Sequence, residues 1–426
     1  MRRNAGLFVA ISLFSGLGGG AMALVAGVWV LDLTGSTGLA ALAGLCVYAP
    51  TLAGPWLGAL LDRAPRRPLV IGVNLALAVA LLSLLAVRGP EQTWLIYAVS
   101  LAYGVSYVLI DAGETALLPA ALSPARLADV NGWRSSAQEG MKLVAPLAGA
   151  GLYAWQGGHV VAVLAAATPV LVAVLYGALR LTRTPPDGPP PARAAGLRDG
   201  LGVLLGRRAV RVPVALAAVS IAMSGFTTAA LYDVVVTGLA LPSTFLGVLA
   251  SAQGGGSLLA GLVVGRLVRS RGEVAVGIAG AALFAAGCLG RCLPWWPGTV
   301  AASAVIGVGL PWTLVAAVTA VQTHTPPAML GRVAGTANTA MFGPITLAIP
   351  LGSAAVQVGG RPPLVVAAGV CLAAAFAAAS RRAGVERGPR VEAADGTGEP
   401  RPVARATDRG SSVCAWIRTG RSGPAP

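Results

Sequence analysis

Long apolar segments recur along the whole chain, and each is separated from the next by a polar or charged turn. Each segment is roughly 20 residues long, the length that an α-helix needs to cross about 30 Å of hydrocarbon. Because every backbone polar group must be satisfied inside a bilayer, helices are the expected form of such segments. We therefore expect an all-α membrane protein with twelve transmembrane helices. The predicted spans are Leu7–Leu31, Leu39–Leu61, Pro68–Val87, Trp94–Leu118, Gly132–Ala154, Val160–Leu179, Val210–Val236, Thr244–Val268, Val274–Leu293, Gly298–Val321, Val333–Val358 and Leu364–Ala379.

A change in composition divides these spans into two sets of six. The stretch from Thr182 to Arg208 is rich in proline and arginine, which predicts a polar linker between the sets. From Arg381 onward the chain is rich in Arg, Gly and Pro with few apolar residues, which predicts a disordered tail. The expected organisation is a first half at 1–181, a linker at 182–208, a second half at 209–380 and a tail at 381–426.

A faint internal repeat relates the two halves. The stretch from Gly58 to Arg66, after the second span, is echoed by Gly261 to Arg269 at the corresponding place in the second half, with Gly265 standing where the first stretch has Asp62. Parallel six-span halves of this kind are typical of transporters whose halves rock about a central site.

Charged residues are few and unevenly placed. Of the 426 residues 55% are hydrophobic and 11% charged, and the mean hydropathy is +0.74, which excludes a water-soluble globular protein. With both termini and the even-numbered turns in the cytoplasm, all but four of the 31 Lys and Arg fall on the cytoplasmic side. The exceptions are Arg88, Arg291 and Arg361 outside and Lys142 within a span. The net charge of +15 therefore reflects topology, and a nucleic-acid partner is not expected.

The same features predict the setting of the chain. Arginine in place of lysine, with abundant Ala, Gly and Pro, indicates a GC-rich bacterial genome, so we expect the bacterial cytoplasmic membrane. The first apolar run is longer than the core of a signal peptide, and we expect it to be kept as the first span. The expected partners are the lipid bilayer and a small-molecule substrate, with the chain acting as a monomer.

The loop from Gly58 to Arg67 resembles the signature loop between spans 2 and 3 of the major facilitator superfamily. Two further segments, Trp29 to Ser36 and Asp111 to Pro119, are similar to segments of its bacterial drug and siderophore exporter branch. The resemblance covers Leu7 to Ala379 and implies two pseudo-symmetric six-helix halves with alternating access to a central cavity. It also implies a conformational latch on the cytoplasmic side. The latch residues would be Gly58, Asp62, Arg63, Arg66 and Arg67.

Two departures from the family pattern bear on mechanism. The stretch from Ala145 to Ala150 keeps only part of the Gly-Pro-x-x-Gly-Gly element that antiporters often carry in span 5. Span 4 lacks the arginine found in many proton-coupled exporters. Two alternatives stay open: an importer or facilitator of a small solute, and a membrane sensor that has the fold without transport. The two departures fit the sensor.

Ionisable residues inside spans are costly to place in a bilayer and are therefore functional candidates. Asp111 and Glu114 lie three residues apart on span 4, and Glu139 and Lys142 do so on span 5, so each pair shares a helix face. We expect these residues to meet near the middle of the first half. Our hypothesis is that Asp111, alone or with Glu114, binds the coupling proton, and that Lys142 is a counter-charge able to lose its own proton. The alternative is a static ion-pair network between spans 4 and 5.

The resemblance implies that spans 1, 4, 7 and 10 line the central cavity. Their aromatic side chains would suit bulky, amphipathic or cationic molecules, although each side chain could equally pack in the core or face lipid. The candidate substrate contacts are Phe14, Trp29, Tyr103, Tyr107, Phe226, Tyr232, Trp312 and Gln322.

No pattern in the sequence calls for a cofactor, a metal ion or a catalytic group. Cys288 and Cys292 lie one helical turn apart but have no His or acid nearby, so apolar packing is the favoured interpretation. The only lysine is followed by Leu143, so the chain lacks a Walker A loop for ATP. We therefore predict a secondary transporter rather than an enzyme, one that exports drug-like compounds or secondary metabolites in exchange for protons.

Overall fold

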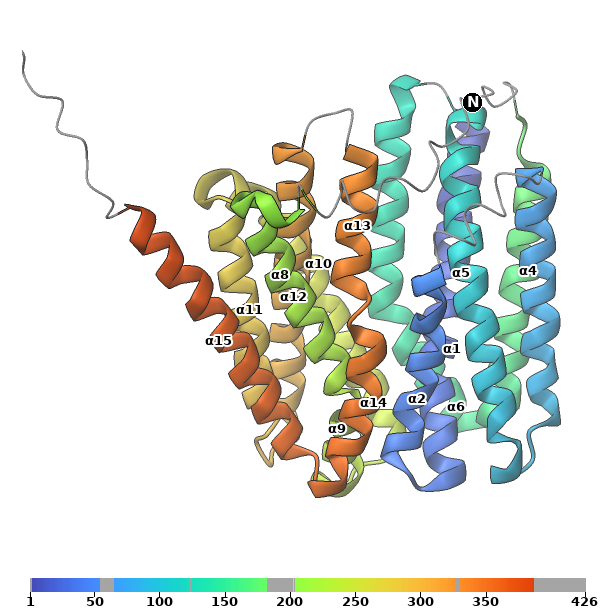
Figure 1. Ribbon diagram of the computed structural model, residues 1–426. Helices are drawn as coiled ribbons and strands as arrows, with labels where there is room; N and C mark the ends of the chain where they lie inside the picture. Colours follow the sequence, from blue (N-terminus) through green and yellow to red (C-terminus); the bar gives the residue numbers. More distant parts are fainter. Residues whose placement is uncertain are drawn as a thin grey trace, which may run out of the picture. The chain divides into compact units, whose positions relative to one another are not determined.

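The computed structural model describes residues 2–53, 65–122, 124–181, 202, 204–325 and 330–386, and these ranges are almost entirely helical (Figure 1). They contain no β-strand, so the all-α prediction is confirmed. The α-helices are α1 (Arg2–Thr34), α2 (Thr37–Tyr48), α4 (Arg66–Ser83), α5 (Thr93–Ala121), α6 (Pro124–Ala178), α8 (Arg208–Phe226), α9 (Thr228–Asp233), α10 (Leu246–Arg271), α11 (Glu273–Gly290), α12 (Trp296–His324), α13 (Leu330–Phe342), α14 (Ile345–Ala355) and α15 (Arg361–Glu386). Shorter helical turns extend or join them: η1 (Ala49–Ala53), η2 (Leu84–Ala86), η3 (Pro90–Gln92), η4 (Val234–Gly238), η5 (Ser243–Phe245) and η7 (Val356–Val358).

Within the described residues the helices match the predicted spans, and the end of the second span, from residue 54 to residue 61, lies outside them. Ten stretches of the described chain are long and apolar enough to cross a membrane, and the shorter stretches Thr37–Ala53 and Thr228–Gly238 are also apolar. One of the ten, Asp129–Ala178, holds two predicted spans. A straight helix of its 50 residues would be about 75 Å long, more than twice the thickness of the hydrocarbon. The chain therefore turns at Gly157, whose φ of 75° lies in a region that favours glycine.

Small residues set the distance between helices in the first half. A Cβ added to Gly16 of α1 would lie 2.9 Å from the Cβ of Met141, and one added to Gly20 would lie 2.9 Å from the Cβ of Ala145. Both partners belong to the first limb of α6. Such close approach is how apolar helices gain van der Waals contact inside a membrane, where the hydrophobic effect contributes little to their association.

The two halves share one packing scheme. In the first half, the fifth span (the first limb of α6) packs against α1 and also against α10 of the second half, where Gly254 faces the backbone of Lys142. In the second half, the fifth span (α13 and α14) packs against α8 and also against α2, where Gly38 faces the carbonyl of Ser353. Each half thus contributes one helix that lies between its own first span and the second span of the other half.

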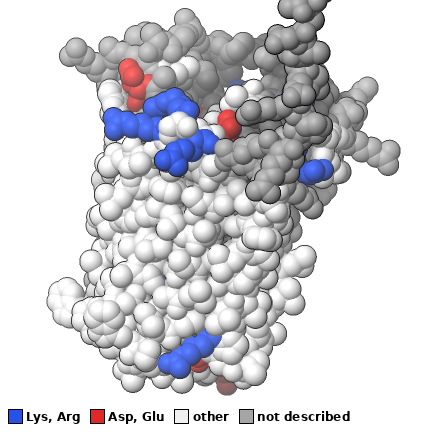
Figure 2. All heavy atoms as spheres, turned by 90° about the vertical axis from the view of Figure 1, so that its left-hand side faces the viewer, with Lys and Arg blue, Asp and Glu red and all other residues white. Residues whose placement is uncertain are grey.

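The surface has the character of a protein that lies in lipid. Figure 2 shows a broad band without charged atoms between two ends that carry Lys, Arg, Asp and Glu, with more basic atoms at one end. Large apolar side chains such as Leu262 and Phe376 are 76% and 75% exposed. An uncharged belt of this kind avoids the cost of placing charges in hydrocarbon. The chain is a multi-pass membrane protein.

Candidate functional site

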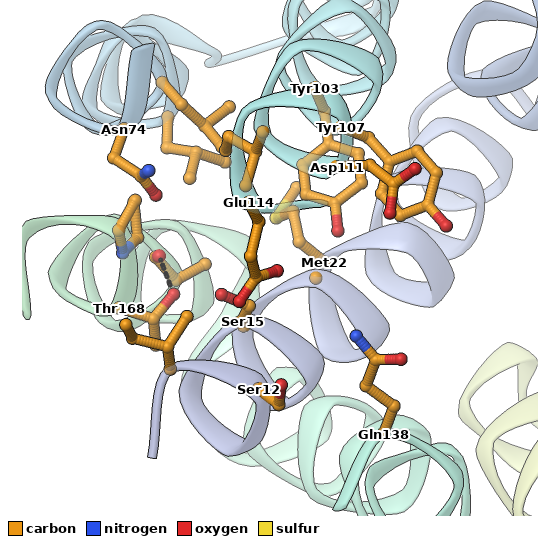
Figure 3. A pocket seen from close by; sticks show the side chains of 18 residues that line it. Ser12, Ser15, Met22, Asn74, Tyr103, Tyr107, Asp111, Glu114, Gln138 and Thr168 are labelled. Atoms are coloured by element: carbon orange, nitrogen blue, oxygen red, sulfur yellow. Dashed lines mark hydrogen bonds between the residues drawn. The ribbon is translucent and has the colours of Figure 1, made fainter. Parts of the chain in front are cut away.

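A polar pocket lies inside the first half, between α1, α4, α5 and both limbs of α6. Its volume is about 120 Å³, below the roughly 300–1,000 Å³ of pockets that hold drug-sized ligands. Figure 3 shows the Glu114 side chain pointing into this space toward Ser12 and Ser15 of α1. The lining residues are Ile11, Ser12, Ser15, Gly18, Gly19, Met22, Asn74, Leu77, Leu81, Tyr103, Tyr107, Ile110, Asp111, Glu114, Gln138, Ala165, Thr168 and Pro169.

Glu114 forms an ion pair at this pocket. Its Oε2 lies 2.5 Å from Nη2 of Arg134 on the first limb of α6, and the two side chains are only 8% and 14% exposed. A buried carboxylate needs a counter-charge, and a guanidinium supplies one that does not lose its proton. The pair therefore ties spans 4 and 5 together with a fixed cation.

Several buried polar atoms around the ion pair lack a hydrogen bond. Within the described residues, the Ser12 hydroxyl and Nε of Arg134 have no hydrogen-bond partner, and Oε1 of Glu114 has at most the Tyr176 hydroxyl beside it. Buried polar groups without partners cost free energy, and two of these residues, Ser12 and Glu114, line the pocket, which favours binding of water or a ligand group there.

The four ionisable residues do not form the single cluster that we expected. Lys142 pairs with Glu139 one turn away on the same helix, at 2.6 Å, and its side chain is 60% exposed. Glu114 takes Arg134 as its counter-charge instead. Arg134 is only two residues after the predicted start of the fifth span, so the topology count assigned its charge to the adjacent cytoplasmic turn rather than to the membrane. Asp111 lines the pocket on the same face of α5 as Glu114, as its spacing predicts.

The aromatic candidates divide into two groups. Tyr103 and Tyr107 of α5 line the pocket. Trp29 and Tyr232 do not, because they are only 5% and 7% exposed and pack in the core. Trp29 makes an edge-on contact with His159, with ring centroids 5.2 Å apart. The others lie elsewhere: Phe14, Phe226 and Trp312 are partly buried beside separate apolar clusters, and Gln322 is exposed near the end of α12.

Three of the expected latch residues, Gly58, Asp62 and Arg63, lie outside the described residues. Arg66 and Arg67 begin α4. Arg67 donates hydrogen bonds to the carbonyls of Tyr176, at 3.1 Å, and Gly177, which belong to the last turn of α6. A cation at that end of a helix satisfies otherwise unpaired carbonyls and complements the helix dipole. Arg67 thus fixes the start of span 3 to the end of span 6.

Asp32, near the end of α1, connects the two halves. Its Oδ1 accepts a hydrogen bond from the Ser243 hydroxyl of the second half at 2.8 Å. Its Oδ2 accepts one from the Tyr153 hydroxyl of α6 at 2.9 Å. Nothing in the sequence links residues 32 and 243.

The contact between α6 and α10 is uneven along their length. Gly247 and Gly254 of α10 approach α6 closely, at Ala150 and Lys142. Seven residues beyond Gly254, on the same face of α10, a Cβ added to Gly261 would meet no heavy atom within 4 Å, and the adjacent Leu262 is 76% exposed. These two helices therefore touch over the part that leads to the Asp32 link and separate toward the other end.

No group of three or more His, Cys, Asp or Glu side chains in the described part of the chain could hold a metal ion. The Cys292 thiol contacts the carbonyl of Cys288 within the same turn, at 3.6 Å. This contact is local and needs no ligand.

A family model described as Major Facilitator Superfamily matches residues 7–245 and 214–416 of the chain. No curated protein matches the sequence.

Several solved structures share the fold. A bacterial homologue of the iron transporter ferroportin in an inward-facing state is 18% identical with a TM-score of 0.63, and the match covers 89% of this chain and 97% of that one. The nucleoside transporter NupG is 15% identical with a TM-score of 0.64, covering 88% and 98%. A bacterial homologue of the human lysosomal transporter Spinster, inward-facing and unoccupied, is 13% identical with a TM-score of 0.59, covering 89% and 98%. Identities this low establish the fold alone.

Proposed function

The chain belongs to the major facilitator superfamily, and on that basis we propose that it exports drug-like compounds or secondary metabolites in exchange for protons, by alternating access. Secondary transport of a small molecule is the general activity of the family. The exchange for protons and the outward direction are the parts that this proposal adds.

The observation that carries the proposal is the pair of acids at the polar pocket. Glu114 is buried and held by the fixed cation Arg134. Asp111 lines the same pocket from an exposed position on α5. An exposed carboxyl group at a pocket is accessible to water, so it is suited to take up and release a proton as the pocket changes its access. We therefore assign proton exchange to Asp111 and a positioning role to Glu114 and Arg134.

Uphill efflux driven by a pH gradient tests this assignment. In proteoliposomes, Asp111→Asn should abolish accumulation driven by the gradient, because the amide cannot carry a proton, while exchange of substrate down its own gradient persists. Glu139→Gln is the matched control, since that carboxylate pairs locally with Lys142. Full retention of gradient-driven efflux by Asp111→Asn would refute proton coupling at this residue.

The shape of the contact between the halves supports alternating access. Lys142 lies midway along the first limb of α6, yet its side chain is 60% exposed. A charged pair this exposed at such depth would be costly against lipid. Together with the separation of α6 and α10 beyond Gly254, it favours a water-filled space between the halves on the side away from Asp32. With the predicted orientation, this space opens to the cytoplasm, the side from which an exporter loads.

The polar lining favours a second candidate, transport of a small hydrogen-bonding solute. Ser12, Asn74 and Gln138 line the pocket beside the acids and offer donors and acceptors that an apolar drug would leave unpaired. Counterflow assays with labelled polar solutes and with lipophilic cations would separate the two candidates. Ligand binding without flux of either class would instead favour a sensor.

The latch remains part of the proposal. We assign the loop from Gly58 to Arg67 the role of holding the cytoplasmic side closed, with Asp62 and Arg63 as its central residues. Arg67 supports this role by bonding the loop's exit to the end of α6.

A further inference from the structure

A second polar pocket lies in the second half, at the end of the bundle away from both the N-terminus and the C-terminal end of α15 (Figure 1). It has a volume of about 280 Å³ and is formed by η4, the turn between α11 and α12, and the turn between η7 and α15. Its charged lining residues are Asp233, Arg291 and Arg361. The transport mechanism proposed above uses none of them.

Arg291 is a buried cation held by neutral groups. It is only 4% exposed. Its Nε and Nη2 donate to the Ser303 hydroxyl at 3.1 and 3.0 Å, and Nη2 also donates to Oε1 of Gln253 at 3.2 Å. Within the described residues it has no carboxylate partner, and its Nη1 has no hydrogen bond. Because a buried charge costs several kcal/mol without a counter-charge, this arrangement indicates an anionic ligand.

The other two charges do not neutralise Arg291. Asp233 approaches the backbone of the opposite wall so closely that a Cβ on Gly360 would lie 2.6 Å from its Oδ2. Neither Asp233 nor Arg361 forms an ion pair within the described residues. The pocket is therefore lined by two cations and one separate anion, and Nη1 is the part of the Arg291 guanidinium left for a ligand. This pattern fits a ligand with a phosphate and an ammonium group.

The pocket's rim is apolar and exposed. Leu293 and Val358 line it and are 52% and 80% exposed. Trp295 and Trp296, next to Leu293, are 61% and 53% exposed. Exposed tryptophans at the end of transmembrane helices are typical of the interface between hydrocarbon and water. The charged pocket thus opens where lipid headgroups lie.

We propose that this pocket binds the headgroup of a phospholipid that carries a primary ammonium, in the leaflet on the side opposite the start of α1. Arg291 and Arg361 bind the phosphate, Asp233 accepts hydrogen bonds from the ammonium group, and the acyl chains lie along Leu293 and Val358. This binding does not depend on which substrate is transported. The predicted orientation is used only to identify the leaflet, which is the outer one if the N-terminus is cytoplasmic.

Lipid retention by the purified full chain tests the proposal. The protein is exposed in detergent to equal amounts of phosphatidylethanolamine, phosphatidylglycerol and phosphatidylcholine with the same acyl chains, and bound lipid is counted by native mass spectrometry. Wild type should retain phosphatidylethanolamine in preference to the other two. Arg361→Gln should reduce this retention roughly fivefold. Arg88→Gln, which removes an exposed arginine from the first half on the same side, should leave it unchanged.

Asp233→Asn tests recognition of the ammonium separately. This variant should retain phosphatidylethanolamine no better than phosphatidylglycerol, and its retention of phosphatidylglycerol should not fall below that of wild type. Because Arg361 lies on the exposed rim, its variant is expected to fold even if Arg291→Gln does not. Unchanged lipid retention in both Arg361→Gln and Asp233→Asn would overturn the proposal and leave Arg291 as a link between α10, α11 and α12. Binding of soluble O-phosphoethanolamine with no retained lipid would overturn the assignment to a membrane lipid.

Discussion

Arg134 determines how the two acids of α5 differ. Both acids lie on one helix face, but Glu114 is nearly buried and pairs with Arg134 at 2.5 Å, whereas Asp111 lies in an exposed position at the pocket. Lys142, the residue that the sequence suggested for this role, pairs with Glu139 at a far more exposed position. A lysine there would provide a counter-charge able to release its proton, whereas an arginine provides a permanent one. The first half therefore holds one fixed pair and one acid, Asp111, that faces the pocket.

We expect the two ion pairs to contribute very differently to stability. Glu114→Gln leaves the guanidinium of Arg134 buried without its counter-charge, and should lower the free energy of unfolding by about 3–5 kcal/mol. Glu139→Gln should cost about 0–1 kcal/mol, because that pair is largely exposed. Reversible unfolding in mixed detergent micelles measures both. The double variant Glu114→Gln, Arg134→Gln should lose less stability than the two single variants Glu114→Gln and Arg134→Gln lose together. A loss equal to their sum would argue against a direct pair.

At the scale of helices, glycines and alanines decide which elements touch. The contact of α10 with α6 depends on Gly247 and Gly254, which lie two turns apart on the same face of α10. A Cβ on Gly254 would lie 2.6 Å from the carbonyl carbon of Lys142. Backbone atoms cannot move aside as the end of a flexible side chain can. A methyl group at this position must therefore push the two helices, and with them the two halves, apart.

Gly254→Ala should therefore destabilise the protein by about 1–3 kcal/mol through overpacking. Gly261→Ala, two turns further along the same helix, is the control, since no heavy atom lies within 4 Å of its added Cβ. That change should be neutral or stabilise the helix by up to about 1 kcal/mol, because alanine is the better helix former. Thermal unfolding of the two variants in detergent gives the comparison. Equal losses would mean that the α6–α10 contact does not hold the halves together.

At the scale of the whole molecule, the Asp32 link and the uneven contact of α6 with α10 correspond to one of the two access states that the proposed mechanism requires. The hydrogen bond from Ser243 to Asp32 crosses between the halves. It must break when the halves separate on that side. Removing this hydrogen bond should therefore shift the population toward the state that is open on the Asp32 side. The size of the shift is set by the free energy that one hydrogen bond to a charged group contributes.

We expect Ser243→Ala to favour opening on the Asp32 side roughly tenfold, corresponding to about 1.5 kcal/mol. Spin labels on cysteines introduced at Trp155 and Val358, which are 78% and 80% exposed, would report the separation of the halves there in a variant lacking the 5 native cysteines. In Ser243→Ala, a larger fraction of molecules should show the longer distance between the two labels. Ser83→Ala, which removes a hydroxyl bonded within its own helix, is the matched control and should leave the distances unchanged. An unchanged distribution in Ser243→Ala would exclude the link as an energetic constraint.

The span count and the chain's turns are readable from the sequence because they depend on local properties. An apolar run of about 20 residues must become a helix in lipid, since no water is present to satisfy its backbone. Gly157 with Gly158 marks the turn inside α6 for the same local reason, the backbone conformation that glycine permits. The shared face of Asp111 and Glu114 follows from helix period alone.

Pairings between distant residues were not readable in the same way. In a helix that is apolar all round, hydrophobic periodicity does not indicate which face meets which neighbour. The sequence therefore gave Trp29 and Tyr232 the same standing as Tyr103, although the fold buries the first two and leaves the third at the pocket. It also gave no sign that Asp32 would meet Ser243, or that Arg291 and Arg361 would share a pocket with Asp233.

The sequence by itself determined that this protein is a helical membrane protein of two related halves, because helix formation and membrane insertion act on short stretches of chain. Only the tertiary structure decided which charge compensates which, where the pockets lie and which part of the interface between the halves is in contact. Those features depend on helix rotation and spacing, which are set by close contacts such as Gly254 with Lys142 and Gly20 with Ala145. Contacts of this kind join residues far apart in the chain, and no local pattern specifies them.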